Sequence, residues 1–180
     1  MLVSKIVSGG QTGVDRGALE AALELGFPYA GLIPKGRLAE DGQVPEKFDK
    51  MEVSTKKDYL FRTEWNVIHS DATLIISNYC DKPNTPKDTL TGGTLRTARF
   101  CETHGKHYSV LFSYDSPSAV PSTIEWLLGV SRDLGKTDIV LNVAGPRESK
   151  AKGIQESARD FVGRLIAEIR NLQKESSSCQ

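Results

Sequence analysis

The residues best suited to chemistry lie in a glycine-rich turn near the N-terminus, between the apolar pair Ile6-Val7 and a helical pattern that starts at Asp15. Glycine permits positive φ angles and lets a ligand approach the backbone closely. A helix that begins here would add free N–H groups and the positive end of its dipole. The turn therefore predicts an anion site. Its candidate ligand-binding residues are Gly9, Gly10, Gln11, Thr12, Gly13, Asp15 and Arg16.

The spacing of this turn excludes two common nucleotide sites. It is not the G-x-G-x-x-G fingerprint, and no Gly-Lys-Ser/Thr follows as in a P-loop. Thr12 and Asp15 have the T-x-x-D spacing of a capping pair, so one of them could simply cap the helix. A tight β–α turn that uses glycine for geometry alone is the alternative interpretation.

A second glycine turn, Gly92-Gly93-Thr94, precedes another helical pattern. Two helix N-termini aimed at one crevice could hold the phosphate and a further polar part of one ligand. Alone the tripeptide is a weak signal, but together with the first turn it favours a phosphorylated ligand. Gly92, Gly93 and Thr94 are therefore candidate site residues.

Two further segments carry charged or polar candidates. Arg147 follows the last predicted strand and could bind a phosphate or carboxylate through its planar guanidinium, although a solvated loop capped by Ser149 is equally consistent. Arg62 and Asn66 share one face of a predicted helix. Two interpretations are open: both side chains point towards the ligand crevice between the helix N-termini, or they form part of an ordinary polar surface.

Other common chemistries find no support in the sequence. The three histidines, His69, His104 and His107, have no acidic or cysteine ligand cluster, and neither G-x-S-x-G nor H-E-x-x-H occurs. No metal site is predicted, and no catalytic residue can be assigned. The three cysteines are widely spaced and odd in number, which is typical of a reduced protein with incidental thiols.

Short apolar runs alternate with helical patterns along the chain, which predicts an α/β fold: a Rossmann-like three-layer sandwich with a mainly parallel central sheet. Near-continuous apolar runs such as Leu74-Ile75-Ile76 are typical of strands covered on both faces. Strands are expected at 5–8, 29–33, 72–77, 108–114 and 138–143. Helices are expected at about 15–25, 58–69, 122–135 and 155–173, and a further helix follows Gly92-Gly93-Thr94 and stops near Gly105. The helix at 122–135 starts with a Ser122–Glu125 capping box.

Long connections show where a ligand would lie. The loops 34–54, 78–91 and 144–154 all leave the carboxyl ends of predicted strands, and ligands of open parallel sheets bind at that edge. We expect one ligand-binding domain over residues 1–173 and a flexible C-terminal tail over 174–180.

Composition narrows the range of partners. The 23 basic and 23 acidic residues balance to a net charge of +0, so no general attraction to nucleic acid or to a membrane surface is expected. Only 7% of the residues are aromatic, which argues against single-stranded DNA as a ligand. Neither a signal peptide nor a long apolar span is evident, so the predicted location is cytoplasmic. Apolar helix faces could form a homo-oligomer.

Five segments together carry a resemblance to a known family. They are Ser8–Leu19, Pro34–Gly42, Arg62–Val67, Gly92–Thr94 and Asn142–Ser149, the last reading Asn-Val-Ala-Gly-Pro-Arg-Glu-Ser. The chain resembles the molybdenum carrier proteins, a circularly permuted branch of the SLOG superfamily of Rossmann-like nucleotide binders. The resemblance implies a Rossmann-like fold and a ligand site built from both glycine turns. Gly145, Arg147 and Glu148 of the last segment are further candidate site residues. It also implies molybdenum cofactor, a phosphorylated pterin, as cargo.

The same superfamily suggests a rival function. Phosphoribohydrolases of this superfamily share the signature P-G-G-x-G-T-x-x-E. The most similar segment of this chain, Thr91–Ala98, lacks the second Gly-Thr step and the glutamate. The leading prediction is therefore a binding or carrier protein for a phosphorylated, nucleotide-like ligand. The alternatives are a sensor of such a ligand and an enzyme that cleaves a nucleotide derivative. The enzyme would need a carboxylate, and Asp15, Glu40, Asp41 and Glu148 are the candidates.

Overall fold

The structure is a computed structural model that describes residues 1–77 and 90–178. Its central sheet has five strands in the order β2-β1-β9-β7-β8, and every pairing in it is parallel. The strands are β1 (Val3–Val7), β2 (Tyr29–Ala30), β7 (Ala72–Ile76), β8 (His107–Leu111) and β9 (Ile139–Ala144). The predicted Rossmann-like α/β class is confirmed.

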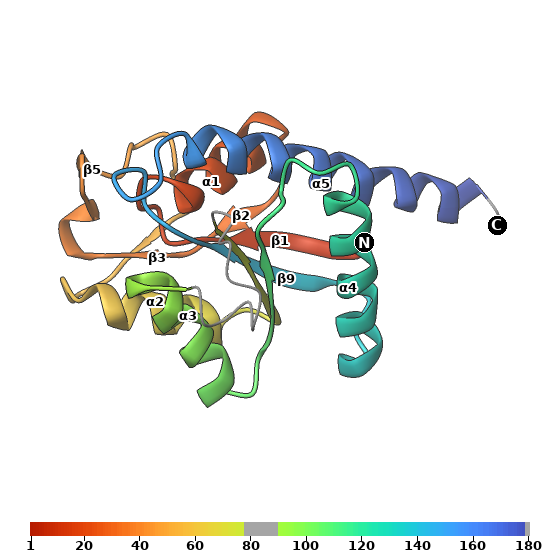
Figure 1. The fold of residues 1–180 in the computed structure, drawn as a ribbon, viewed down its shortest axis with the longest axis horizontal. Helices are drawn as coiled ribbons and strands as arrows, with labels where there is room; N and C mark the ends of the chain where they lie inside the picture. The colour runs from red at the N-terminus through yellow and green to blue at the C-terminus, as the bar shows by residue number, and fades with distance from the viewer. Residues whose placement is uncertain (78–89, 179–180) are drawn as a thin grey trace.

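Helices cover both faces of this sheet (Figure 1). Helix α1 (Val14–Glu24) packs along α5 (Ile154–Ser178), and α4 (Ala119–Leu134) also contacts α5. Helices α2 (Tyr59–Ile68) and α3 (Gly92–Thr103) pack on each other at the opposite side of the sheet, below it in Figure 1. The arrangement is the expected three-layer sandwich.

Strand β7 shows why the apolar runs lack alternation. All of its residues are buried, and successive side chains of a strand point to opposite faces. Leu74 and Ile76 join the large core beneath α1, α4 and α5, whereas Ile75 packs with Ala98 of α3 in a second, smaller core. A strand covered on both sides is therefore mostly apolar, and its one polar side chain, Thr73, accepts a hydrogen bond from Nδ2 of Asn142 at 3.2 Å.

The strand expected at 29–33 is divided in two. Gly31 has a φ of 149°, and a Cβ at this residue would lie 1.9 Å from the carbonyl oxygen of Ser8. Beyond this break, β3 (Leu32–Ile33) leaves the central sheet and pairs with β6 (Glu52–Val53). The close approach of two backbones, which only glycine allows, redirects the chain.

The long connection expected at 34–54 forms regular secondary structure. It contains a short 3-10 turn (Lys35–Arg37), the hairpin of β4 (Leu38–Ala39) and β5 (Gly42–Gln43), and β6. Buried Val44, Phe48 and Met51 anchor it to the main core. This burial fixes the position of the hairpin next to the first glycine turn.

Two helix boundaries differ from expectation. Helix α4 begins at Ala119 and not at Ser122, whose N–H donates to the carbonyl of Ser118 inside the helix. The predicted capping box was therefore wrong. The helix can begin before Pro121 because this proline lies in the first turn, where its missing N–H costs no hydrogen bond. Helix α5 continues to Ser178, so the segment 174–178, expected in the tail, is helical.

Most of the loop expected at 78–91 lies outside the described residues. In the parts of the chain that are described, no helix is both long and apolar enough to cross a membrane.

Candidate functional site

The first glycine turn is largely engaged within the protein. Gly13, with a φ of 81°, is the N-cap of α1, and no side chain caps this helix, so the expected Thr12–Asp15 capping pair is wrong. The N–H of Gly13 donates to Oε1 of Gln155 at 3.2 Å, and the N–H of Val14 donates to the carbonyl of Pro146 at 3.2 Å. These two amides, predicted to receive an anion, already have partners.

Thr12 belongs to a polar cluster behind the turn. Its hydroxyl donates to the carboxylate of Glu40, which also accepts the N–H of Ser149 at 3.1 Å and the Ser149 hydroxyl. Arg147 lies 3.6 Å from the same carboxylate. Burial opposes ionisation, but these hydrogen bonds together hold the pKa of Glu40 below its ordinary value. Glu40 thus joins the hairpin, the α1 turn and the 145–150 segment.

Arg16 is also used structurally. Its guanidinium is 6% exposed and forms a bidentate ion pair with Asp41 of the hairpin. The hydrogen bond from Arg16 lowers the pKa of Asp41. Glu148 accepts the N–H groups of Gly153 and Gln155 at the start of α5. Both predicted site residues therefore serve the scaffold.

A cleft of about 380 Å³ opens at the carboxyl edge of the sheet, between the ends of β1 and β9 and the first turns of α2 and α3. We call it the carboxyl-edge cleft. A cleft here is the general consequence of a parallel sheet whose strands all end at one edge. It is lined by Gly9, Gln11, Asp15, Tyr59, Leu60, Arg62, Thr63, Asn66, Thr91, Gly92, Gly93, Thr94, Arg96, Thr97, Asn142, Ala144, Gly145, Pro146, Arg147 and Lys150.

An ion pair lies at the inner wall of this cleft. Nη1 of Arg62 donates to Oδ2 of Asp15 at 2.8 Å, and the two side chains are 12% and 8% exposed. Burial raises the pKa of Asp15, against the lowering effects of Arg62, of the Gln11 N–H and of Arg16. Nε of Arg62 is buried and has no hydrogen-bond partner among the described residues.

Asn66 forms the deepest part of the α2 side. It is 2% exposed, its Oδ1 accepts the N–H of Leu32 at 2.8 Å, and its Nδ2 donates to the Leu32 carbonyl at 3.2 Å. This bidentate bond pairs α2 with the chain just beyond Gly31. Asn66 lines the cleft, but its amide is committed to the backbone.

The start of α3 differs from the start of α1. Its N-cap, Thr91, makes no side-chain capping hydrogen bond. A Cβ built on Gly92 or Gly93 would meet no atom of the described residues within 4 Å, and Gly93 does not have a positive φ. No packing contact among the described residues requires glycine at Gly93. Within the described part of the chain, this helix N-terminus is therefore open to the cleft, where its dipole favours an anion.

Basic side chains surround this opening. Arg96, Arg147 and Lys150 are exposed and line the cleft together with Arg62. Asp15 is the carboxylate that accompanies them in the lining. A nearly neutral chain thus carries a locally cationic cleft, as expected for local anion recognition.

The structure brings most, but not all, of the predicted site residues together. The predicted residues that line the cleft are Gly9, Gln11, Asp15, Arg62, Asn66, Gly92, Gly93, Thr94, Gly145 and Arg147. Gly10, Thr12, Gly13, Arg16 and Glu148 do not line it. A Cβ on Gly10 would press on Ile33 and Val44, and one on Gly13 would lie 2.3 Å from the Pro146 carbonyl. These glycines serve packing.

Several of the residues that line the cleft were not predicted from the sequence. Tyr59 and Thr63 lie at helical spacing from Arg62 and Asn66, so periodicity could have found them. Asn142 and Ala144 end β9 and follow from the rule for parallel sheets. Lys150 had no signal that sets it apart from other loop lysines. Among the described residues, no group of three or more His, Cys, Asp or Glu is arranged to hold a metal ion.

Fold and cleft together define a Rossmann-like α/β protein with a cationic cleft at the carboxyl edge of its sheet. The chain belongs to the circularly permutated YpsA SLOG family, whose model matches residues 6–166. It is also similar to a solved structure from Syntrophus aciditrophicus SB described as a "Putative molybdenum carrier protein". The two share 36% identity over 91% of this chain and 95% of the other, with a TM-score of 0.78. The resemblance seen in the sequence is thus confirmed.

A search among curated proteins gave no match for the chain.

Proposed function

We propose that this protein binds and carries a small phosphorylated, nucleotide-like ligand in the carboxyl-edge cleft, and that it does so in the cytoplasm. The observation that carries the proposal is the open N-terminus of α3, where Gly92 and Gly93 leave space next to Arg96, Arg147 and Lys150. A phosphate there would accept from N–H groups of the first turn of α3, and its charge would be balanced by these three cations.

The candidate cargo is molybdenum cofactor. The name of the similar Syntrophus aciditrophicus structure supports it, and so does the fit between a phosphorylated pterin and a cationic cleft of about 380 Å³. Because the described residues offer no cluster of metal ligands, the protein would hold this cargo by its organic part and phosphate.

The first experiment is native mass spectrometry of freshly purified protein, in which a co-purifying ligand is identified by its mass. The second compares Gly93→Ala with Gly129→Ala. Both glycines lie in helices without positive φ, and a Cβ on Gly129 would meet only Nη2 of Arg132, at 3.9 Å. Both variants should keep the fold, because alanine favours helices over glycine.

Gly93→Ala should weaken ligand binding about tenfold or more, since its methyl group fills the space that phosphate needs, whereas Gly129→Ala should bind like the wild type. Equal binding by Gly93→Ala and the wild type would exclude the α3 N-terminus as the phosphate site.

A second candidate function, cleavage of a nucleotide derivative, is favoured by one observation. Of the four candidate carboxylates, Asp15 lines the cleft, and burial raises its pKa against the lowering effect of its partner Arg62. Glu40, Asp41 and Glu148 are committed to hydrogen bonds outside the lining. Incubation with nucleoside monophosphates and ADP-ribose tests this function: released base or ribose phosphate, abolished by Asp15→Asn, would establish an enzyme.

A further inference from the structure

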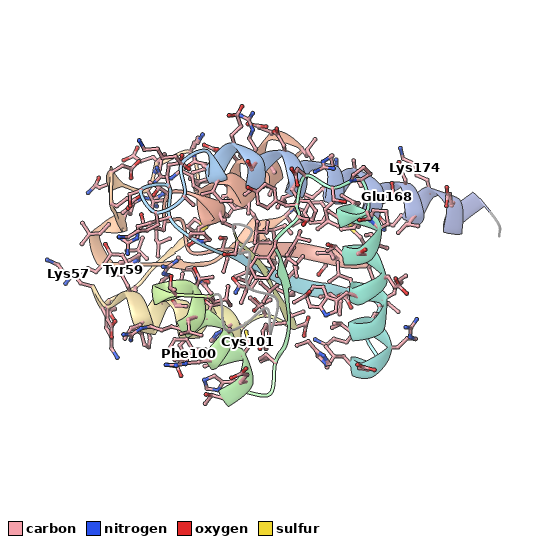
Figure 2. The ribbon with its side chains drawn as sticks, viewed as in Figure 1. Lys57, Tyr59, Phe100, Cys101, Glu168 and Lys174 are labelled. Carbon is pink, nitrogen blue, oxygen red and sulfur yellow. The ribbon has the colours of Figure 1, made fainter. Side chains whose placement is uncertain are left out.

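Helix α2 contributes a row of side chains to the carboxyl-edge cleft whose exposure and polarity change along the helix. Asn66 at the inner end is 2% exposed and Arg62 has a side chain that is 12% exposed, whereas Tyr59 at the outer end is 42% exposed. Figure 2 shows Tyr59 where α2 begins, near Lys57 and at the opposite end of the molecule from Lys174. The mouth of the cleft therefore carries an aromatic ring.

Tyr59 is unlike the other aromatic residues of α2. The ring of Phe61 lies under Nζ of Lys56, 4.3 Å from the ring centroid, and Trp65 stacks on His69 with centroids 3.8 Å apart. The ring of Tyr59 has no such partner among the described residues, although it lines the cleft. An exposed aromatic ring next to a cationic cleft is a surface on which a planar heterocycle can stack.

Leu60 extends this apolar surface. It is 39% exposed and also lines the cleft, and its N–H donates to Oδ1 of Asp58 at 2.7 Å. Asp58 thereby caps α2 and fixes the backbone of the turn that carries Tyr59 and Leu60. The backbone of this surface is therefore already ordered before a ligand binds.

We infer that Tyr59 and Leu60 form a ring-binding wall, which makes the cleft selective for phosphorylated ligands that carry a planar heterocycle over sugar phosphates of similar charge. This inference rests on the proposed function, because the phosphate at the start of α3 brings the ring to the wall. The phosphate site at the start of α3 supplies affinity for any small phosphate ester. The ring-binding wall adds discrimination that the cations cannot provide.

Titration calorimetry with guanosine 5′-monophosphate and ribose 5-phosphate tests the wall. The wild type should bind the nucleotide about tenfold or more tightly than the sugar phosphate, the factor expected from one stacked ring. Tyr59→Ala should remove most of this preference by weakening nucleotide binding alone. Tyr59→Phe keeps the ring and should keep the preference. Leu60→Ala should reduce it, whereas Leu128→Ala, a similarly exposed leucine on α4, should not.

The outcomes separate the two proposals. If Tyr59→Ala weakens both probes equally, or neither, the ring-binding wall is wrong while phosphate binding stands. If Gly93→Ala leaves both affinities unchanged, the phosphate site at α3 is wrong. If neither probe binds the wild type, the proposed function fails and the wall fails with it.

Discussion

The guanidinium of Arg62 lies 2.8 Å from the carboxylate of Asp15, in the space that a side chain on Gly9 would occupy. A Cβ on Gly9 would lie 1.3 Å from Nη1 of Arg62. The pair connects α2 on one face of the sheet with α1 on the other, across the end of β1. Gly9 is therefore required by an ion pair between helices that the sheet separates.

Removal of one partner should destabilise the protein strongly. Arg62→Met leaves Asp15 buried without its counter-ion, which typically costs about 3–5 kcal/mol. Urea unfolding followed by circular dichroism measures the loss. The double variant Asp15→Asn/Arg62→Met should recover about half of it, because no unpaired charge is then buried. A single variant as stable as the wild type would contradict this account.

The two glycine turns should respond differently to alanine. Gly13→Ala combines a positive φ with a Cβ 2.3 Å from the Pro146 carbonyl, so we expect a loss of roughly 2–4 kcal/mol. Gly26→Ala is the matched control, because Gly26 also has a positive φ but no neighbour within 4 Å. It should cost only about 1–2 kcal/mol. Equal losses in thermal or urea unfolding would show that packing against Pro146 is unimportant.

The cations of the cleft should contribute to binding individually. Arg96 lines the cleft, whereas Arg99 of the same helix lies outside its lining and is also exposed. Arg96→Gln should weaken the binding of guanosine 5′-monophosphate by about tenfold at low salt, and by less as salt screens the interaction. Arg99→Gln should have no effect. Calorimetric titrations at two salt concentrations measure both affinities. Equal effects of the two variants would show that Arg96 does not contribute to binding through its place in the cleft.

Glu40 should make the protein sensitive to acid. Its folded-state pKa lies below the unfolded value of about 4.3, so its stabilising effect is complete above that pH and is lost as pH falls through the folded-state pKa. Glu40→Gln should be less stable than the wild type at pH 7, and this difference should shrink below about pH 4. Urea unfolding from pH 3 to 7 measures it. The exposed Glu46→Gln should follow the wild-type curve.

Local pattern determined the architecture. The alternation of apolar runs and helical periods predicted the five central strands and the three layers, since such patterns leave few ways to bury both faces of a parallel sheet. The same alternation places the N-termini of α1 and α3 at the carboxyl edge, so the position of the cleft followed from the order of elements.

The role of each glycine was decided only by tertiary structure. Gly13 and Gly93 both lie where a helix begins after a glycine-rich turn, but Gly13 packs against Pro146 whereas a Cβ on Gly93 would contact no described residue. A positive φ, a close backbone contact and room for a ligand all favour glycine, so residue type alone cannot distinguish them.

Tertiary structure also decided which charges face the cleft. Arg16 pairs with Asp41, and Arg62 lines the cleft beside Asp15, through contacts between segments far apart in the chain. Sequence periodicity describes one element at a time, so it could identify a polar helix face but not the loop or helix opposite it. The location of the candidate site could thus be predicted from the sequence, whereas the residues that form it depended on how distant segments of the chain pack.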